Sequence, residues 1–177
     1  RLNLDGSGPA DGPGQSDEAD LVHAVRREPE MVEHRLKLAN FYRKAARLEE
    51  ATTTLTEALE LSEGDSGIRE SLEDVQLDQL RQDLNLAKDA AAGNNDDVAN
   101  RNVRALGEEL IKREIEVFSS RIERYPNDLK LKSELGNRFV RIKKYNQAIP
   151  LFQVCVKDQR LQTAALTSLG KCFIAEK

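Results

Sequence analysis

Side chains that could carry out catalysis are sparse in this 177-residue chain. His23 and His34 are its only histidines, and both lie in charged sequence without a serine, cysteine or metal-ligand set around them. The adjacent carboxylates at 96–97 and 108–109 sit beside one another rather than across a cleft. No glycine-rich phosphate loop follows a strand pattern. We therefore predict no enzyme, no catalytic residue and no cofactor.

The two cysteines, Cys155 and Cys172, have no Cys-x-x-Cys spacing and no paired histidine nearby. Their spacing predicts no metal site. A disulfide between adjacent helices stays open from sequence alone, but two cysteines in helical sequence are more often small apolar residues in a reducing compartment. This favours a cytoplasmic protein.

Charge is unevenly distributed along the chain. Residues 1–128 contain 17 basic and 28 acidic side chains, whereas residues 129–177 contain 10 basic and 3 acidic ones. The basic end favours an electrostatic partner or head-to-tail attraction between molecules, and a solvated charged surface explains it about as well. Nucleic acid is an unlikely partner, because the basic residues lack interleaved aromatic side chains and the whole chain has a net charge of -4.

One pattern of small and large apolar residues occurs twice in full. The first copy reads Leu38-Ala39-x-x-Tyr42 and continues with Ala51-x-x-x-Leu55-x-x-Ala58. The second reads Leu135-Gly136-x-x-Phe139 and continues with Ala148-x-x-x-Phe152-x-x-Cys155. Leu169-Gly170-x-x-Phe173 opens a third copy, 34 residues after the second. Small residues allow a neighbouring helix to approach and the aromatic fills space one turn later, so each copy predicts a helical hairpin.

The chain resembles the tetratricopeptide repeat (TPR) family in this pattern and in its 34-residue period. The resemblance covers residues 32–65 and 129–177. It departs from the family where Arg35 and Lys132 replace the usual Trp, and where Glu63 replaces a closing proline. It implies an all-α fold, a TPR-like superhelix of antiparallel helix pairs.

The middle of the chain does not keep this period, since 63 residues separate the two units, five fewer than two repeats. From Ile68 to Ala92 there is no Pro or Gly, and leucines and alanines recur at helical spacing. Asp96 and Asp97 then suit a helix start, and a second apolar stripe runs to Tyr125. We predict a long central helical hairpin, while a degenerate pair of repeats stays the alternative.

Four segments follow from these patterns: a disordered tail (1–15), an N-terminal TPR-like unit with a preceding helix (16–65), the long hairpin (66–128) and C-terminal TPR-like repeats, the last truncated (129–177). Asp128 is expected to cap one repeat helix, and Asn146 another, which would place Pro150 in a first turn. No stretch is long and apolar enough for a membrane helix. The chain reads as a piece of a longer repeat protein.

The resemblance also implies a concave groove lined by the first helix of each pair. Residues opposite the buried stripe are polar and mainly basic, and asparagine can hydrogen-bond a peptide backbone while Lys and Arg pair with carboxylates. The carboxylate-clamp pattern of chaperone-binding members is incomplete, since Leu36 and Ser133 stand at clamp positions. The candidate partner-binding residues are Asn40, Arg43, Lys44, Lys130, Asn137, Arg141 and Lys171.

These expectations lead to a non-enzymatic scaffold that binds an acidic peptide or protein segment in a groove of its C-terminal repeats. The alternative is a structural protein that forms homo-oligomers through the long hairpin or the unfinished terminal repeat. The two hypotheses differ in whether exposed basic residues or exposed apolar residues carry the interaction.

Overall fold

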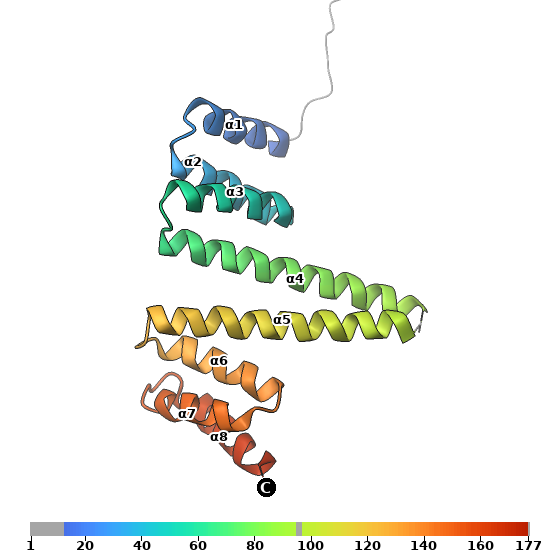
Figure 1. Ribbon diagram of the computed structural model, residues 1–177, viewed down its shortest axis with the longest axis vertical. Helices are drawn as coiled ribbons and strands as arrows, with labels where there is room; N and C mark the ends of the chain where they lie inside the picture. The colour runs from blue at the N-terminus through green and yellow to red at the C-terminus, as the bar shows by residue number, and fades with distance from the viewer. Residues whose placement is uncertain (1–12, 95–96, 177) are drawn as a thin grey trace, which may run out of the picture. The chain divides into compact units, whose positions relative to one another are not determined.

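The computed structural model describes residues 13–94 and 97–176, and in this part of the chain α-helices joined by short connections are the only regular secondary structure (Figure 1). The all-α prediction is confirmed. The helices, in chain order, are α1 (Pro13–Arg27), α2 (Val32–Lys44), α3 (Leu48–Leu61), α4 (Ser66–Asn94), α5 (Asp97–Arg124), α6 (Leu129–Arg141), α7 (Tyr145–Cys155) and α8 (Gln162–Ala175).

The chain divides into two compact units, and the boundary falls inside α4. Unit 1 is Arg1–Gln79 and unit 2 is Leu80–Lys177. The sequence-based segments followed the repeat period, whereas these units follow contacts between helices. Each unit is therefore described by itself.

Unit 1 is built on the pair α2 and α3, joined by a turn in which Ala46 has a positive φ of 57°. The predicted small residues are at the centre of the pair: Ala39 is 2% exposed, and Ala51 is fully buried. Leu55 and Tyr42 complete this core, and α1 packs against α2. The first copy of the pattern thus forms the predicted helical hairpin.

Unit 2 contains the second hairpin, α6 and α7, followed by α8. Its core includes Phe152, Cys155 and Cys172, all fully buried. A Cβ atom on Gly136 would lie 2.8 Å from the ring of Phe152, so α6 and α7 approach closely only because residue 136 has no side chain. Gly136 thus allows the close approach of a neighbouring helix that was predicted for the small residue of the second copy.

The two longest helices, α4 and α5, cover the residues for which the sequence predicted a long helical hairpin. Residues 80–94 of α4 belong to the same unit as α5 and run beside it in the opposite direction (Figure 1). Arg81 of α4 and Glu114 of α5 connect the two helices through an ion pair of 2.8 Å. Leu84, Leu110 and Val117 are buried in this unit.

The helix ends agree only in part with those predicted from the sequence. The Asp128 side chain caps α6 by accepting hydrogen bonds from the backbone N–H groups of Lys130 and Leu131, as predicted. The predicted cap at Asn146 is wrong: α7 begins at Tyr145, so Pro150 lies inside the helix rather than in its first turn. Helix α1 begins at Pro13, inside the segment expected to be disordered, and residues 1–12 lie outside the described residues.

The third copy of the pattern packs differently from the second. A Cβ atom on Gly170 would meet no described neighbour within 4 Å, and Phe173 is 50% exposed. The expectation that both residues pack against a neighbouring helix is therefore wrong within the described chain. The face of α8 that carries Ala165, Leu169 and Cys172 is buried in the unit 2 core, where α8 contacts α7.

Candidate partner-binding surfaces

Three predicted residues form an exposed stripe along α6. Lys130, Asn137 and Arg141 follow one another at steps of seven and four residues, and all are exposed. They lie opposite the buried Leu135 and Gly136, because residues seven apart share a helix face. The side chains of Lys130 and Asn137 form no hydrogen bond or ion pair with a described residue, so both are open to a partner.

Helix α8 carries a further predicted residue. It contacts α6 within unit 2, and Lys171 on α8 is exposed. Lys171 lies 34 residues after Asn137 and so takes the same position in the next copy of the pattern. Because Arg141 pairs with Glu114, we leave it out and call Lys130, Asn137 and Lys171 the unit 2 stripe.

A hollow of about 510 Å³ adjoins the start of the unit 2 stripe. It lies where the α5–α6 and α7–α8 connections meet, and the stripe contributes Lys130 to it, together with the neighbouring Ser133. Arg160 also lines it, and hydrogen bonds from Arg160 hold the pKa of the Asp158 carboxyl below its usual value. The hollow therefore combines two cations with three carboxylates, and Asp128, Glu134 and Asp158 each already have an internal partner.

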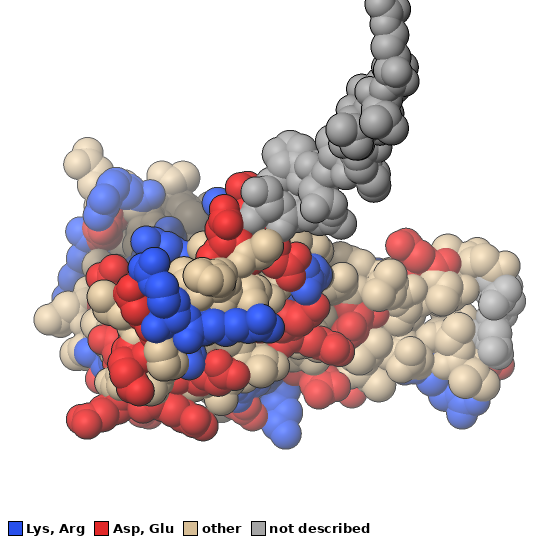
Figure 2. Space-filling view, turned by 90° about the horizontal axis from the view of Figure 1, so that it is seen from above, with Lys and Arg blue, Asp and Glu red and all other residues tan. Residues whose placement is uncertain are grey.

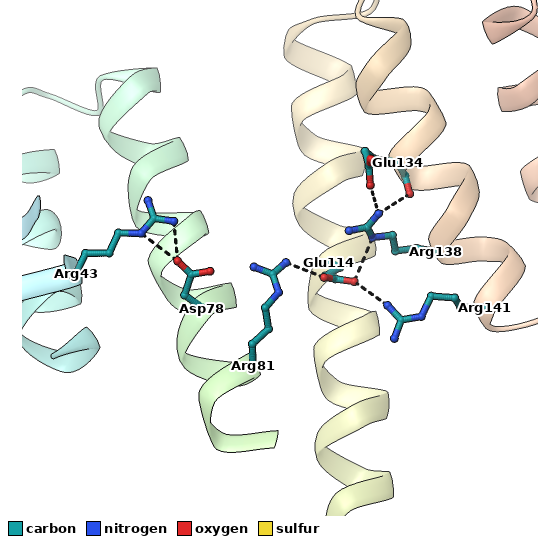
Figure 3. Close-up of polar contacts among 7 residues, drawn as sticks. All are labelled: Arg43, Asp78, Arg81, Glu114, Glu134, Arg138 and Arg141. Atoms are coloured by element: carbon teal, nitrogen blue, oxygen red, sulfur yellow. Dashed lines mark hydrogen bonds and ion pairs between the residues drawn. The ribbon is translucent and has the colours of Figure 1, made fainter. Parts of the chain in front are cut away.

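Arg141, unlike the rest of α6's exposed face, has an internal partner (Figure 3). Its guanidinium lies 3.5 Å from Glu114, whose side chain is only 4% exposed. Arg81 and Arg138 also pair with this carboxylate, at 2.8 and 3.1 Å. Burial raises the pKa of Glu114, but hydrogen bonds and charge from Arg81 and Arg138 outweigh burial and lower it below its usual value. Glu114 is thus a buried anion that organises three cations.

Arg138 completes this cluster. Its guanidinium lies 4.7 Å from the centre of the Phe118 ring and also pairs with Glu134. Only 16% of the Arg138 side chain is exposed. Helix periodicity gave no signal for the cluster, because it joins α4, α5 and α6.

In unit 1, the predicted residues of α2 also separate into engaged and open side chains. Arg43 donates two hydrogen bonds to Asp78 of α4, at 3.0 and 2.6 Å, as Figure 3 shows. Asn40 and Lys44 are exposed and form no side-chain contact of this kind with a described residue. The basic face expected from the sequence is therefore smaller than its residue count suggests.

Asn40 and Lys44 line a second hollow, of about 570 Å³, between α1 and α2. The sequence did not single out the other residues in this hollow. Lys37 could have been found, since it precedes Asn40 by three residues and Lys44 by seven. The remaining lining residues are Asp17, Asp20, Leu21 and Phe41.

No arrangement suited to metal binding was found in the described ranges. There, no three His, Cys, Asp or Glu side chains lie close enough together to hold a metal ion. Cys155 and Cys172 are both free and buried, and burial raises the pKa of both thiols. A raised pKa lowers the thiolate fraction, so neither is suited to act as a nucleophile.

Comparisons with known proteins found similar solved structures, but no matching family model and no matching curated protein. Among solved structures, the chain is similar to one described as "YrrB: a TPR protein with an unusual peptide-binding site". The identity is 16%, the TM-score is 0.44, and the match covers 88% of this chain and 82% of the other. None of the helices described here is long and apolar enough to cross a membrane.

Proposed function

We propose that this protein is a non-enzymatic scaffold of TPR-like repeats that binds an acidic segment of another protein along the unit 2 stripe. The observation that carries the proposal is the open state of Lys130, Asn137 and Lys171 on two helices in contact. Their side chains have no hydrogen-bond or ion-pair partner among the described residues, while other faces of α6 and α8 are buried. Lys can pair with carboxylates, and Asn can hydrogen-bond an extended backbone.

Charge supports an acidic partner for this region. Residues 129–177 contain 10 basic and 3 acidic side chains, so an anionic segment meets a favourable potential there. Arg141 is already paired with Glu114, so the proposal rests on the two lysines and Asn137. The two buried free cysteines suit a reducing compartment, which supports a cytoplasmic location as part of the proposal.

The test uses capped, fluorescein-labelled peptides, one rich in Glu and one with Gln at the same positions. Fluorescence anisotropy measures binding to the native chain and to a Lys130→Glu, Lys171→Glu variant. The matched control is Lys88→Glu, Lys112→Glu, which makes the same charge change at two exposed lysines of the long hairpin. We expect the first variant to bind the Glu peptide at least roughly tenfold more weakly than the control.

Two results would overturn this proposal. One is equal binding of the Glu and Gln peptides to the native chain. The other is an equal loss of affinity in both variants, which would reduce the effect to net charge. Reversal of Arg141 is unsuitable here, because a carboxylate at that position would face Glu114 and destabilise unit 2.

Self-association is the second candidate, and the exposed apolar face of α8 favours it. Leu166, Phe173 and Ile174 are 53%, 50% and 76% exposed, with open space at Gly170 between them. The long hairpin offers less than expected, because Phe118 already faces Arg138. Sedimentation equilibrium tests this candidate: an oligomer of the native chain that dissociates in Ile174→Glu would support it, and a monomer at all concentrations would exclude it.

A further inference from the structure

The hollow between α1 and α2 has walls of opposite charge. Asp17 and Asp20 lie three residues apart on α1, and Lys37 and Lys44 lie seven residues apart on α2, so each pair shares one face of its helix. The hollow is open to solvent and has a volume of about 570 Å³. A volume of this size matches ligand sites in proteins, which span about 300–1,000 Å³.

All four charged side chains are exposed and have no partner in the described chain. Helix α1 is instead anchored by Glu18, which pairs with Arg47 at 2.8 Å, and by apolar residues that pack on the unit 1 core. The two walls therefore stay apart without neutralising each other. On the face shown in Figure 2, basic and acidic side chains lie next to one another.

The residues between the charged walls are not ionic. Leu21 and Phe41 are half-buried and pack against the unit 1 core, so they offer a fixed apolar floor. Asn40 lies in the same hollow, with an amide that can both donate and accept hydrogen bonds. Such a lining can hold a short stretch of peptide by its backbone and one apolar side chain.

We infer that this hollow binds a peptide segment in which an apolar side chain is flanked by one cationic and one anionic side chain. The cationic group pairs with the α1 wall, the anionic group with the α2 wall, and the apolar side chain rests on Leu21 and Phe41. The inference rests on the proposed function only in that the protein binds peptides. It concerns a different unit and a different partner chemistry.

Segments of a single charge are rejected by one wall or the other. A purely acidic segment would bring its carboxylates toward Asp17 and Asp20, and a purely basic one would bring its ammonium groups toward Lys37 and Lys44. Like charges brought together weaken binding and so provide specificity. The hollow therefore selects the mixed segment by repulsion as well as by attraction.

The experiment titrates the full chain with three capped peptides of equal length and a central leucine. The leucine is flanked by one Lys and one Glu, by two Glu or by two Lys. Chemical shifts of α1 and α2 amides report binding in this hollow, separately from the unit 2 stripe. We expect the mixed peptide to bind roughly tenfold more tightly than either other peptide.

Exchanging the charge of one wall should exchange the preference. With Asp17→Lys and Asp20→Lys both walls are basic, so the two-Glu peptide becomes the best ligand. With Lys37→Glu and Lys44→Glu both walls are acidic, so the two-Lys peptide becomes the best ligand. The matched control for the first variant is Glu33→Lys with Glu60→Lys, two exposed carboxylates outside the hollow, and it keeps the preference for the mixed peptide.

Three results would overturn the inference: no peptide shifts α1 and α2, the native chain does not prefer the mixed peptide, or the wall variants lose binding without exchanging preference. An unfolded variant cannot mimic the expected result, because it would not gain affinity for a new peptide. The Lys130→Glu, Lys171→Glu variant should leave these preferences unchanged. A failure of the proposed acidic-segment binding in unit 2 is thus distinguishable from a failure of mixed-peptide binding in the hollow of unit 1.

Discussion

The two helical hairpins of this protein share one pattern but fill it with different residues. In unit 1 the buried positions are Ala39 on α2 and Leu55 on α3. The corresponding positions in unit 2, 97 residues later, are Gly136 and Phe152. In unit 2, Gly136 on the first helix of the hairpin lacks the methyl group of Ala39, while Phe152 on the second helix is larger than Leu55. Packing density is thus kept by the sum of the two volumes rather than by either residue alone.

The units also differ in how they hold a carboxylate beside their basic residues. In unit 1, Asp78 pairs with Arg43, and about a third of each side chain is exposed. In unit 2, the buried Glu114 pairs with three arginines from α4 and α6. The ion pair of Asp78 is therefore partly solvated, whereas those of Glu114 are internal. Removal of the two carboxylates should lower the free energy of unfolding by different amounts.

Removal of the two carboxylates gives the largest expected contrast. Glu114→Ala leaves three arginines without their common anion and should lower the free energy of unfolding by about 3 kcal/mol. Asp78→Ala removes a partly solvated pair and should cost about 1 kcal/mol or less. Urea denaturation followed by circular dichroism measures both. Equal losses in the two variants would contradict the distinction between peripheral and internal ion pairs.

Exchange of volumes between the hairpins is expected to have the next largest effect. Gly136→Ala places a methyl group 2.8 Å from the Phe152 ring and should destabilise unit 2 by about 1–3 kcal/mol. Adding Phe152→Leu reproduces the Ala and Leu pair of unit 1. The double variant should be more stable than the sum of the two single effects by about 1 kcal/mol or more.

The reciprocal exchange in unit 1 serves as the control. Ala39→Gly with Leu55→Phe should show coupling of the same sign, since it recreates the unit 2 pair. Additive effects in both units, measured by urea denaturation, would mean that the two positions do not compensate each other.

Acid should weaken unit 2 through Glu114. Its folded pKa lies below its usual value of 4.5, so its ion pairs stabilise the protein at pH values above 4.5. This contribution is lost as pH falls through the folded pKa. The stability difference between the native chain and Glu114→Gln should therefore shrink as pH drops below about 4.5. A difference that stays constant between neutral and acidic pH would contradict the assignment.

Sequence predicted the helices and their pairing because these follow from local periodicity. The spacing around Leu38 and Leu135 located both hairpins, and the run from Ile68 located the long helix. Asp128 was identified as a cap, since a capping side chain binds backbone groups two and three residues away. Asn146 was misassigned because a proline was assumed to require a first turn, whereas α7 accommodates Pro150 inside the helix.

The surfaces were less predictable, because exposure and charge depend on helices far away in sequence. Arg141 has the spacing of a groove residue, but its partner Glu114 lies on another helix. Asp17 and Asp20 face the basic α2 only because α1 folds back onto it. Periodicity can therefore place a side chain on a helix face, but its partners require the tertiary contacts.

The smallest expected effect compares the two glycines that share one pattern. Gly170 is exposed on α8 with open space around it, in contrast to Gly136 on α6. Gly170→Ala should therefore stabilise the protein by about 0.5–1 kcal/mol, because alanine restricts the unfolded chain and favours the helix. Thermal unfolding at several protein concentrations measures this gain. A loss of stability that grows with concentration would instead show that a second molecule packs closely on this glycine, and would favour self-association through α8.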